Sequence, residues 1–540
     1  MSKNYNLNWN DLYLKSDDEL ILIASEIRNY LIENITKTGG HIGSSLGLVE
    51  LTLCLMKNFH QNKTAMLFDT GHNSHVYKIL TYGWDIIKSL NTSTSSSVFQ
   101  EMLENKFDYF SSGHSSTALS FLNGFQITKF KENLIAIVGD AAFENGISFE
   151  GLFSISQKED KVIIILNDNG EGIGKNYLKS PNWKTFFESM KFNYYFCNEG
   201  NNIVALNKII EQIKNTNQKS VLHIKTIKSL GLISKYQNDS NHFISNTTLN
   251  ENDSQIIVSN LLKEELNDQN TFVINPGMTY ASMQQDLISN KNFLDVGINE
   301  EHAILLAASL SSQNKKVYLS IYSTFFQREY DFFIHDVIRN KLPITFIIDK
   351  VGIQYNTGNS HHGIYDLSIV NLFNEVVIMQ PRNKFELEKM FYFAKKNNSI
   401  NVIRNEKLNL DSFLNIDFEF GQWEKVIFDS NNKILICYGD AVNEFEKIIK
   451  AKNIKIDLIN ARFINPIDIK LLDEIKDKEI IVYEQVIQKN NLATNIEKNI
   501  NKKIKSICIE TFFVGNGHKK DILKKNNLYY DDVLDQLTEG

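Results

Sequence analysis

Residues 134–140 read LIAIVGD, an apolar run that ends in Gly-Asp, and residues 162–170 read VIIILNDNG. Short runs this rich in Ile and Val are typical of strands buried on both faces of a parallel sheet. Asp140 and Asn169 would then lie at adjacent carboxyl ends of the sheet, where their side-chain oxygens could hold one hard cation that carries a diphosphate. Gly-Asp and Asp-Asn are also common turn dipeptides, and taken alone the pair is explained slightly better by two unrelated turns.

Apolar runs of this kind alternate with longer amphipathic stretches through most of the 540 residues. The alternation predicts parallel sheets covered by helices. The predicted strands are 134–138, 162–166, 221–225, 317–321, 344–348, 376–379, 434–437, 454–458 and 480–483. Helical periodicity is clearest in 20–36, 301–312, 385–396 and 444–451.

Two polar breaks, 237–254 and roughly 405–424, interrupt this series. A chain of this length is expected to form two to four domains. We therefore predict an α/β protein of three domains, near 1–245, 265–405 and 425–540, each with a mainly parallel sheet flanked by helices.

The composition narrows the classes of partner. A net charge of −7 and a pI near 6.0 give no reason to expect nucleic acid or an anionic membrane as a partner. The sequence has no run of about 18 apolar residues, which predicts a soluble protein without membrane spans. Four widely spaced cysteines without a CxxC pair favour free thiols in a reducing, cytoplasmic compartment.

Six further segments carry a family resemblance. They are GGHIGSSLGLVELTL (39–53), DTGHNSHVYKIL (69–80), SSGHSSTALS (111–120), DVGINEEHAILLAASL (295–310), IYSTFFQREYDFFIHDV (321–337) and NARFINPID (460–468). Together with GDA and LNDN they resemble, in order and over almost the whole chain, the 1-deoxy-D-xylulose-5-phosphate synthase family. That family belongs to the thiamine-diphosphate-dependent transketolase superfamily, and the chain looks like a divergent, shortened member.

The resemblance implies a transferase that condenses pyruvate with glyceraldehyde 3-phosphate, with loss of CO₂, to give 1-deoxy-D-xylulose 5-phosphate. That product feeds isoprenoid, thiamine and pyridoxal synthesis. The resemblance also implies thiamine diphosphate and Mg²⁺ as cofactors, with the diphosphate on the first domain and the pyrimidine on the second. It implies a homodimer as the assembly.

Glu300 is the residue on which the expected chemistry depends most. The resemblance makes it the carboxyl that promotes the imino form of the cofactor's aminopyrimidine. A buried Glu with a raised pKa suits that role. The alternative is an acid at the N-terminus of helix 301–312, where the helix dipole favours it. The GINEEH context (297–302) favours the functional interpretation.

The remaining positions are implied by matching the family's motifs residue by residue. The other proton-transferring groups are His41, His72 and His361. The cofactor-binding positions are His72, Gly113, His114, Ser115, Gly139, Asp140, Ala141, Ala142, Asn169, Ile173, Glu300 and Phe325. The Mg²⁺ ligands are Asp140, Asn169 and the carbonyl of Glu171, and the substrate-binding positions are Tyr322, Arg328, Arg404, His242 and Thr357. Without the resemblance, Ile173 would be a core residue, and Arg328 would pair with Glu329 or Asp331.

The chain also departs from the family's pattern. Ala141 replaces a Gly, and Thr357 replaces a substrate-facing Asp. Arg404 is followed by NEKL instead of Tyr-Pro-Arg-Gly, and the 175–198 connection is short. These changes leave open a transketolase-like carboligase with an altered donor or acceptor, and a non-catalytic relative that binds the cofactor. A decarboxylase that feeds a lipoyl domain is disfavoured because the chain shows no lipoyl-carrier or docking segment.

Overall fold

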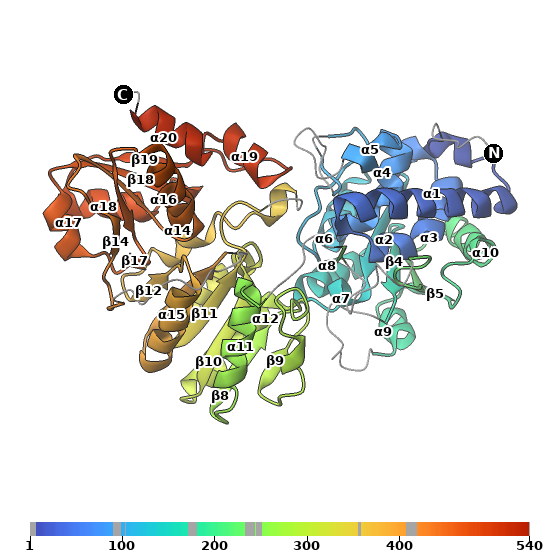
Figure 1. Ribbon diagram of the computed structural model, residues 1–540. Helices are drawn as coiled ribbons and strands as arrows, with labels where there is room; N and C mark the ends of the chain where they lie inside the picture. The colour runs from blue at the N-terminus through green and yellow to red at the C-terminus, as the bar shows by residue number, and fades with distance from the viewer. Residues whose placement is uncertain are drawn as a thin grey trace. The chain divides into compact units, whose positions relative to one another are not determined.

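The computed structural model describes residues 7–89, 99–102, 104–170, 181–232, 243–244, 251–354, 358–406 and 418–538 (Figure 1). The chain divides into two units. Unit 1 comprises residues 1–248 with the short segments 297–299 and 356–360, and unit 2 comprises the rest. No helix in the described part of the chain combines the length and the apolar content that crossing a membrane requires.

Unit 1 is built on a five-stranded, all-parallel sheet in the order β2-β3-β4-β6-β5. Its strands are β2 (Thr64–Phe68), β3 (Asn133–Gly139), β4 (Ile163–Asp168), β5 (Asn193–Cys197) and β6 (Ser220–Lys225). A separate two-stranded pair joins β1 (Gly40–His41) to β7 (Phe243–Ile244). The central strands are apolar on both sides because helices cover both faces of the sheet.

One face of this sheet packs against α1, α3 and α10, and the other packs against α6 and α8. Ile135 and Ile137 belong to the first core, and the alternate residues Ala136 and Val138 belong to the second, as the two-residue period of a strand requires. The helices of unit 1 are α1 (Asp17–Thr38), α2 (Gly43–Gly47), α3 (Val49–Asn58), α4 (His75–Tyr82), α5 (Asp85–Ser89), α6 (Ala118–Thr128), α7 (Asp140–Phe143), α8 (Gly146–Ser156), α9 (Trp183–Ser189) and α10 (Ile203–Lys214).

Unit 2 contains two sheets. The larger has the order β17-β12-β13-β11-β10-β8-β9 and is parallel except for β17. Its strands are β8 (Thr271–Asn275), β9 (Phe293–Asp295), β10 (Lys316–Tyr322), β11 (Ile344–Asp349), β12 (Val376–Met379), β13 (Ile400–Asn405) and β17 (Phe463–Asn465). The smaller has the order β14-β16-β15-β18-β19 and is parallel except for β14. Its strands are β14 (Glu424–Ile427), β15 (Lys433–Cys437), β16 (Asp457–Asn460), β18 (Glu479–Ile487) and β19 (Lys505–Ile509).

The helices of unit 2 cover these sheets and connect their strands. They are α11 (Ser254–Glu265), α12 (Glu300–Ser312), α13 (Tyr330–Phe332), α14 (Asp366–Val370), α15 (Lys384–Lys396), α16 (Asp440–Lys452), α17 (Ile469–Ile475), α18 (Leu492–Ile500), α19 (Lys519–Lys525) and α20 (Tyr530–Thr538). Leu319 and Ile348 of the larger sheet share a core with Ile436 and Val482 of the smaller one. The expected ranges 265–405 and 425–540 are thus two sheets of one unit, and β17 from the second range joins the sheet of the first.

The predicted strands and helices are observed, most of them within two or three residues of the expected ends. The clearest displacement is the strand expected at 454–458, because β16 begins only at Asp457. Asn453 adopts a left-handed conformation (φ 52°) at the end of α16, and the Ile454 N–H bonds back to the carbonyl of Ile449. Residues 453 and 454 therefore complete the helix terminus before the strand begins.

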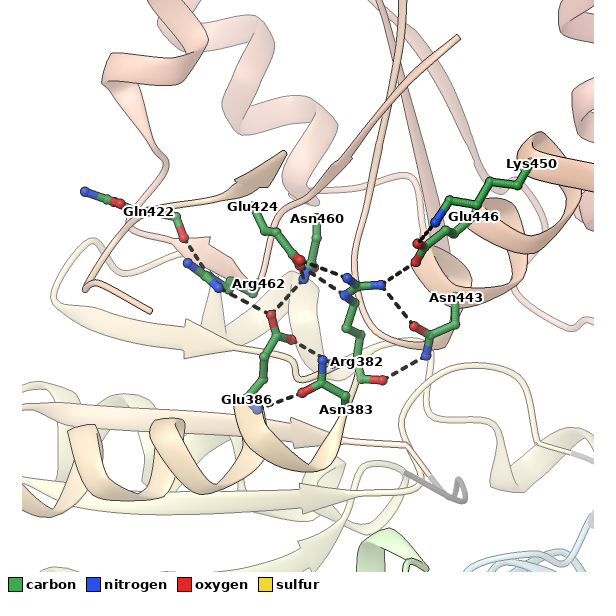
Figure 2. A network of polar contacts seen from close by, with 10 residues as sticks. All are labelled: Arg382, Asn383, Glu386, Gln422, Glu424, Asn443, Glu446, Lys450, Asn460 and Arg462. Carbon is green, nitrogen blue, oxygen red and sulfur yellow. Dashed lines mark hydrogen bonds and ion pairs between the residues drawn. The ribbon is translucent and has the colours of Figure 1, made fainter. Parts of the chain in front are cut away.

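A polar network joins the two sheets of unit 2 (Figure 2). Arg382, which follows β12, donates to both carboxylate oxygens of Glu424 on β14, at 3.0 and 2.8 Å, and to Glu446 on α16 at 2.8 Å. Glu386, in the first turn of α15, accepts from the Asn460 amide of β16 at 2.9 Å. The network therefore connects β12 and α15 of the larger sheet to three elements of the smaller one.

Arg382→Ala is expected to lower the free energy of unfolding by about 2–3 kcal/mol, because it removes charge-assisted hydrogen bonds to two carboxylates. Lys425→Ala is the matched control, since Lys425 pairs with Glu474 at the surface and both side chains are well exposed. That variant should lose at most about 1 kcal/mol. Urea unfolding of the three proteins measures both effects. Equal losses in the two variants would contradict a special role for the network.

Candidate functional site

The carboxyl ends of β3 and β4 bring the predicted metal ligands together in unit 1. The two strands are adjacent and parallel, with Gly139 opposite Asn167. Asp140 follows directly after β3, and Asn169 follows β4. The Oδ1 of Asp140 accepts the backbone N–H of Ala141 at 3.0 Å. Burial raises the pKa of Asp140, and the nearby Asp168 acts in the same direction.

Asp168 is a fixed negative charge at the same strand ends. Its Oδ2 lies 2.9 Å from Nε2 of His223 and also accepts from Lys225. The other ring nitrogen of His223 lies 2.6 Å from the Tyr194 hydroxyl. Burial alone would raise the pKa of Asp168, but the hydrogen bonds from His223 and Lys225 outweigh it and lower that pKa to about 2.

These residues fit a hard divalent cation bound to a diphosphate. Asp140 and Asn169 offer a carboxylate and an amide oxygen, which are the donor types that Mg²⁺ prefers. A Cβ added at Gly139 or at Gly170 would meet no atom of the described residues within 4 Å, so these residues leave space open beside both strand ends. Within the described residues there is no group of three or more His, Cys, Asp or Glu side chains that could hold a metal. A cation here would therefore rely on amide, carbonyl and phosphate oxygens as well.

A loop that carries three predicted cofactor contacts, Gly113, His114 and Ser115, is anchored by Asp69. The Asp69 carboxylate accepts the N–H groups of Ser116 at 2.6 Å and Ala118 at 3.0 Å. Ser116 itself has a positive φ of 74° and donates its hydroxyl to the carbonyl of Ala142 at 2.9 Å. The loop is thus tied to the segment that begins with Asp140. Asp69, which the structure buries fully, was not singled out by the sequence analysis; its sequence signal is an acid directly after the apolar run 65–68.

Two of the predicted catalytic histidines lie against each other in unit 1. The rings of His41 on β1 and His72 in the turn 71–74 stack with centroids 4.9 Å apart and an interplanar angle of 15°. Gly71 permits this turn, because a Cβ there would lie 2.3 Å from the side chain of Phe99. The motifs at 39–53 and 69–80 therefore meet at these two rings.

Unit 2 holds Glu300, the carboxyl on which the expected chemistry depends. Glu300 is the first residue of α12, and its side chain is buried, with 3% of the residue exposed. Its Oε2 has no hydrogen-bond partner within the part of the chain that the structure describes, and lies 3.6 Å from a guanidinium nitrogen of Arg328. Burial raises the pKa of Glu300 to about 7, against the opposing charge of Arg328. Arg328 thus lies beside Glu300; the surface pair with Glu329 or Asp331, weighed from the sequence, is not what the structure shows.

Three other predicted site residues form an aromatic cluster at the end of β10. Tyr322 stacks on Phe325 with centroids 5.9 Å apart, and Phe325 meets His361 edge-on at 5.5 Å. The ammonium of Lys350 lies 4.0 Å from the centroid of the Tyr322 ring. Tyr322 is buried, and its hydroxyl has no hydrogen-bond partner among the described residues.

Arg404 is engaged in a buried ion pair. Only 1% of it is exposed, and its guanidinium donates to both carboxylate oxygens of Asp366, at 2.7 and 3.1 Å. A third hydrogen bond runs to the side-chain carbonyl of Gln380. Burial opposes the charge of Arg404, but Asp366 outweighs this effect and raises the pKa of the guanidinium. In the structure Arg404 is thus held in a buried ion pair within unit 2.

Four expected site residues, Glu171, Ile173, His242 and Thr357, lie outside the described residues. The others fall into two groups, one in each unit. Sequence reasoning also missed Glu329 and Asp349, which are buried acids in unit 2 with raised pKa values. Glu329 lies inside the quoted motif 321–337, where a charge between aromatic residues was the available signal.

Family models match both halves of the candidate site. A model described as 1-deoxy-D-xylulose-5-phosphate synthase matches residues 6–179, and one described as the transketolase pyrimidine-binding domain matches residues 258–412. Among solved structures, a transketolase from Campylobacter jejuni is 14% identical, with a TM-score of 0.48, and covers 96% of this chain and 99% of its own. A split-gene transketolase, described as an inactive β4 tetramer, is 17% identical with a TM-score of 0.46, and covers 53% of this chain and 97% of its own.

Curated relatives match the chain from end to end. The 1-deoxy-D-xylulose-5-phosphate synthase of Malacoplasma penetrans (strain HF-2) is 33% identical, over 98% of both chains. The enzyme of the same name from Clostridium perfringens (strain 13 / Type A) is 32% identical over 97% of both chains, and that of Clostridium tetani (strain Massachusetts / E88) is 30% identical over 98% of this chain and 97% of its own. On this likeness over its full length, the chain belongs to the 1-deoxy-D-xylulose-5-phosphate synthase family.

Proposed function

We propose that the chain is a transketolase-type transferase that condenses pyruvate with glyceraldehyde 3-phosphate, with loss of CO₂, to give 1-deoxy-D-xylulose 5-phosphate. The observation that carries this proposal is Glu300, a buried carboxyl with a pKa near 7 and one oxygen without a hydrogen-bond partner in the described structure. A carboxyl of this kind can exchange a proton with a ring nitrogen near neutral pH. The product would enter isoprenoid biosynthesis.

Thiamine diphosphate with Mg²⁺ is the cofactor that the residues fit, and when bound it supplies the nucleophilic carbon and the electron sink for decarboxylation. Asp140 and Asn169, with the carbonyl of Glu171, would hold Mg²⁺ against the diphosphate. The loop of Gly113, His114 and Ser115 would bind the cofactor beside the segment from Gly139 to Ala142. Phe325 would stack on the pyrimidine, and Ile173 would hold the bent cofactor.

Glu300 would exchange a proton with the ring nitrogen of the pyrimidine, N1′, and Arg328 would stabilise the charged form of that carboxyl. His41, His72 and His361 would move protons at the carbonyl oxygens of the two substrates. Arg328, Tyr322, His242 and Thr357 remain the proposed contacts to the acceptor. Arg404 is not among these proposed contacts, because it is buried against Asp366.

The ion pair between Arg404 and Asp366 favours a second candidate function, a carboligase of the same type with an altered acceptor. Two arginines were expected to bind the acceptor's phosphate, and one of them lies in a buried ion pair. The other, Arg328, lies beside Glu300. A phosphate site with fewer cations binds a phosphorylated aldehyde less tightly, so an unphosphorylated or shorter acceptor could compete.

The release of ¹⁴CO₂ from carboxyl-labelled pyruvate tests both candidates. With thiamine diphosphate and Mg²⁺ present, we expect release that rises sharply when glyceraldehyde 3-phosphate is added, together with formation of 1-deoxy-D-xylulose 5-phosphate. Release that responds equally to glyceraldehyde would establish the altered acceptor. No release from pyruvate with any aldehyde, while the cofactor is bound, would overturn both and leave a non-catalytic, cofactor-binding relative.

We also propose that the chain forms a homodimer through the outer face of α6 and α8. These helices pack against each other and expose several large apolar side chains, Phe121, Ile127, Phe149 and Phe153, where a monomer would carry polar residues. An apolar patch on packed helices is typical of a protein interface. A reducing, cytoplasmic compartment is supported by the four cysteines, all of which are buried free thiols.

Phe153→Asp is expected to shift the chain from dimer to monomer in sedimentation velocity, because it places a charge in the centre of this apolar face. Phe153 is 64% exposed, so the substitution should not disturb the core. Val204→Asp on α10, where Val204 is 56% exposed, is the matched control and should leave the dimer intact. A wild-type chain that sediments as a monomer, or a Phe153→Asp variant that remains a dimer, would contradict this interface.

A further inference from the structure

Glu329 is a buried acid for which the proposed function gives no role. It is the last residue of the short helix 325–329, and its relative exposure is 0%. Neither carboxylate oxygen has a hydrogen-bond partner among the described residues. Burying a carboxyl without partners is costly, and most buried carboxyls in proteins are paired. Glu329 lies within the motif 321–337, which also contains Tyr322, Phe325 and Arg328.

The charges that act on Glu329 come from the start of α12, which packs on the helix 325–329. They belong to Glu300 and Glu301, and burial adds to them, so the pKa of Glu329 is raised well above its ordinary range. The preceding Arg328 directs its guanidinium to Glu300. Tyr330, which follows, is influenced instead by Asp366, Tyr365 and Arg404. Of the two buried acids, Glu300 and Glu329, only Glu300 is shown paired with the Arg328 guanidinium.

One guanidinium cannot neutralise two fully buried carboxylates, so Glu300 and Glu329 cannot both be ionised at neutral pH. Glu300 is the acid beside Arg328 and therefore ionises first. Glu329 then keeps its proton and carries an O–H donor that no described residue accepts. The Oε2 of Glu300, on the helix that packs against 325–329, also lacks a hydrogen-bond partner among the described residues and could accept from that donor once Glu300 is ionised.

We propose that Glu329 is a positioning residue for Glu300. The protonated carboxyl of Glu329 donates a hydrogen bond to the Glu300 carboxylate when Glu300 gives up its proton. The two carboxyls together then hold one proton and one negative charge, and Arg328 offsets that charge. When the proton returns from the cofactor to Glu300, the hydrogen bond is released, so that no proton is gained or lost by the pair over a cycle. The proposal rests on the proposed role of Glu300.

The protonation of Glu329 can be tested without any activity. The carbonyl stretch of a buried, protonated carboxylic acid is resolved from that of carboxylates in difference infrared spectra. In the full-length protein without cofactor at pH 8, where Glu300 is ionised, we expect one such band to be lost in Glu329→Gln and kept in Glu301→Gln. If the wild-type band is absent at pH 8, or persists in Glu329→Gln, the proposal is overturned, whatever reaction the chain catalyses.

The link to Glu300 is tested by the pH dependence of kcat/KM for ¹⁴CO₂ release. Glu329→Leu removes the donor, so the ionisation of Glu300 should move upward by about one pH unit. Glu329→Gln keeps an N–H donor and should restore most of the wild-type profile. Glu301→Gln removes a negative charge that raises the pKa of Glu300, so it should not move the ionisation upward. Unchanged profiles in both Glu329 variants, with the infrared band lost, would reduce Glu329 to a buried structural acid and overturn the proposal. If no pyruvate turnover is found, the same variants can be compared by calorimetry, which measures how the binding of thiamine diphosphate depends on pH.

Discussion

Glu300→Gln is expected to lower the rate of CO₂ release from pyruvate by about 10³-fold, the typical contribution of a positioned acid–base group. The amide has nearly the shape of the carboxyl but cannot exchange a proton with the pyrimidine ring. Retention of the pyruvate activity in this variant would contradict the role proposed for Glu300. Glu301→Gln, one residue along the same helix turn, is the matched control and should stay within a few-fold of the wild type.

Although Glu300→Gln should lower the rate, it should raise the stability of the protein at neutral and higher pH. Burial raises the pKa of Glu300 from 4.5 to about 7, so the folded protein binds this proton more tightly than the unfolded chain does. Its contribution to stability is therefore fully present below pH 4.5 and is lost as the pH rises to 7. A shift of this size corresponds to roughly 3 kcal/mol. Gln does not titrate and escapes that loss.

In the protein without cofactor, the free energy of unfolding of Glu300→Gln relative to wild type should thus increase by up to about 3 kcal/mol between pH 5 and pH 8. Urea unfolding at the two pH values measures it, with Glu301→Gln as the reference for a change of charge in the same turn. A difference that is independent of pH would show that Glu300 is ionised throughout this range, and would remove the physical basis for its proposed role.

Arg404→Ala is expected to lower the free energy of unfolding by about 3–5 kcal/mol, because it leaves the Asp366 carboxylate buried without its partner. Both side chains are essentially inaccessible, with exposures of 1% and 0%. Arg404→Lys keeps the charge but loses the fork that reaches both oxygens of Asp366, and should cost about 1–3 kcal/mol. Urea unfolding at neutral pH ranks the wild type, Arg404→Lys and Arg404→Ala in that order.

The matched control replaces the whole pair. In Arg404→Met combined with Asp366→Leu no charge is left unpaired, so most of the stability should return. If Arg404 were instead a substrate ligand, Arg404→Ala would raise KM for glyceraldehyde 3-phosphate with little loss of stability. That pattern, measured well below the unfolding temperature, would contradict the structural role and restore the expectation drawn from the sequence.

Much of the fold could be predicted because the central strands carry a simple pattern. β3, β4, β10, β11 and β12 are covered on both faces and consist mostly of buried apolar residues. The strands that the sequence analysis missed are mostly edge strands, such as β2, β5, β14 and β19. β5, β14 and β19 are partly exposed, so their apolar pattern is mixed with polar residues and does not stand out from a loop.

The residues of the candidate site could be named from their motifs, because a motif specifies which side chains follow a strand or begin a helix. Asp140 follows β3, Asn169 follows β4 and Glu300 begins α12, and each position can be found along the chain. A motif does not state which partner a side chain meets, since the partner comes from a distant segment. Arg404 donates to Asp366, 38 residues away, and nothing in its motif indicates that partner.

The charge state of these groups was decided by tertiary structure as well. Asp168 and Glu329 are both acids within quoted motifs, yet hydrogen bonds from His223 and Lys225 lower the pKa of Asp168, while burial and the charge of Glu300 raise the pKa of Glu329. The order of residues along the chain therefore determines the strands, the helices and the family to which the chain belongs. Packing determines which of its charges are paired, because desolvation and ion pairing depend on neighbours that only the folded chain brings together.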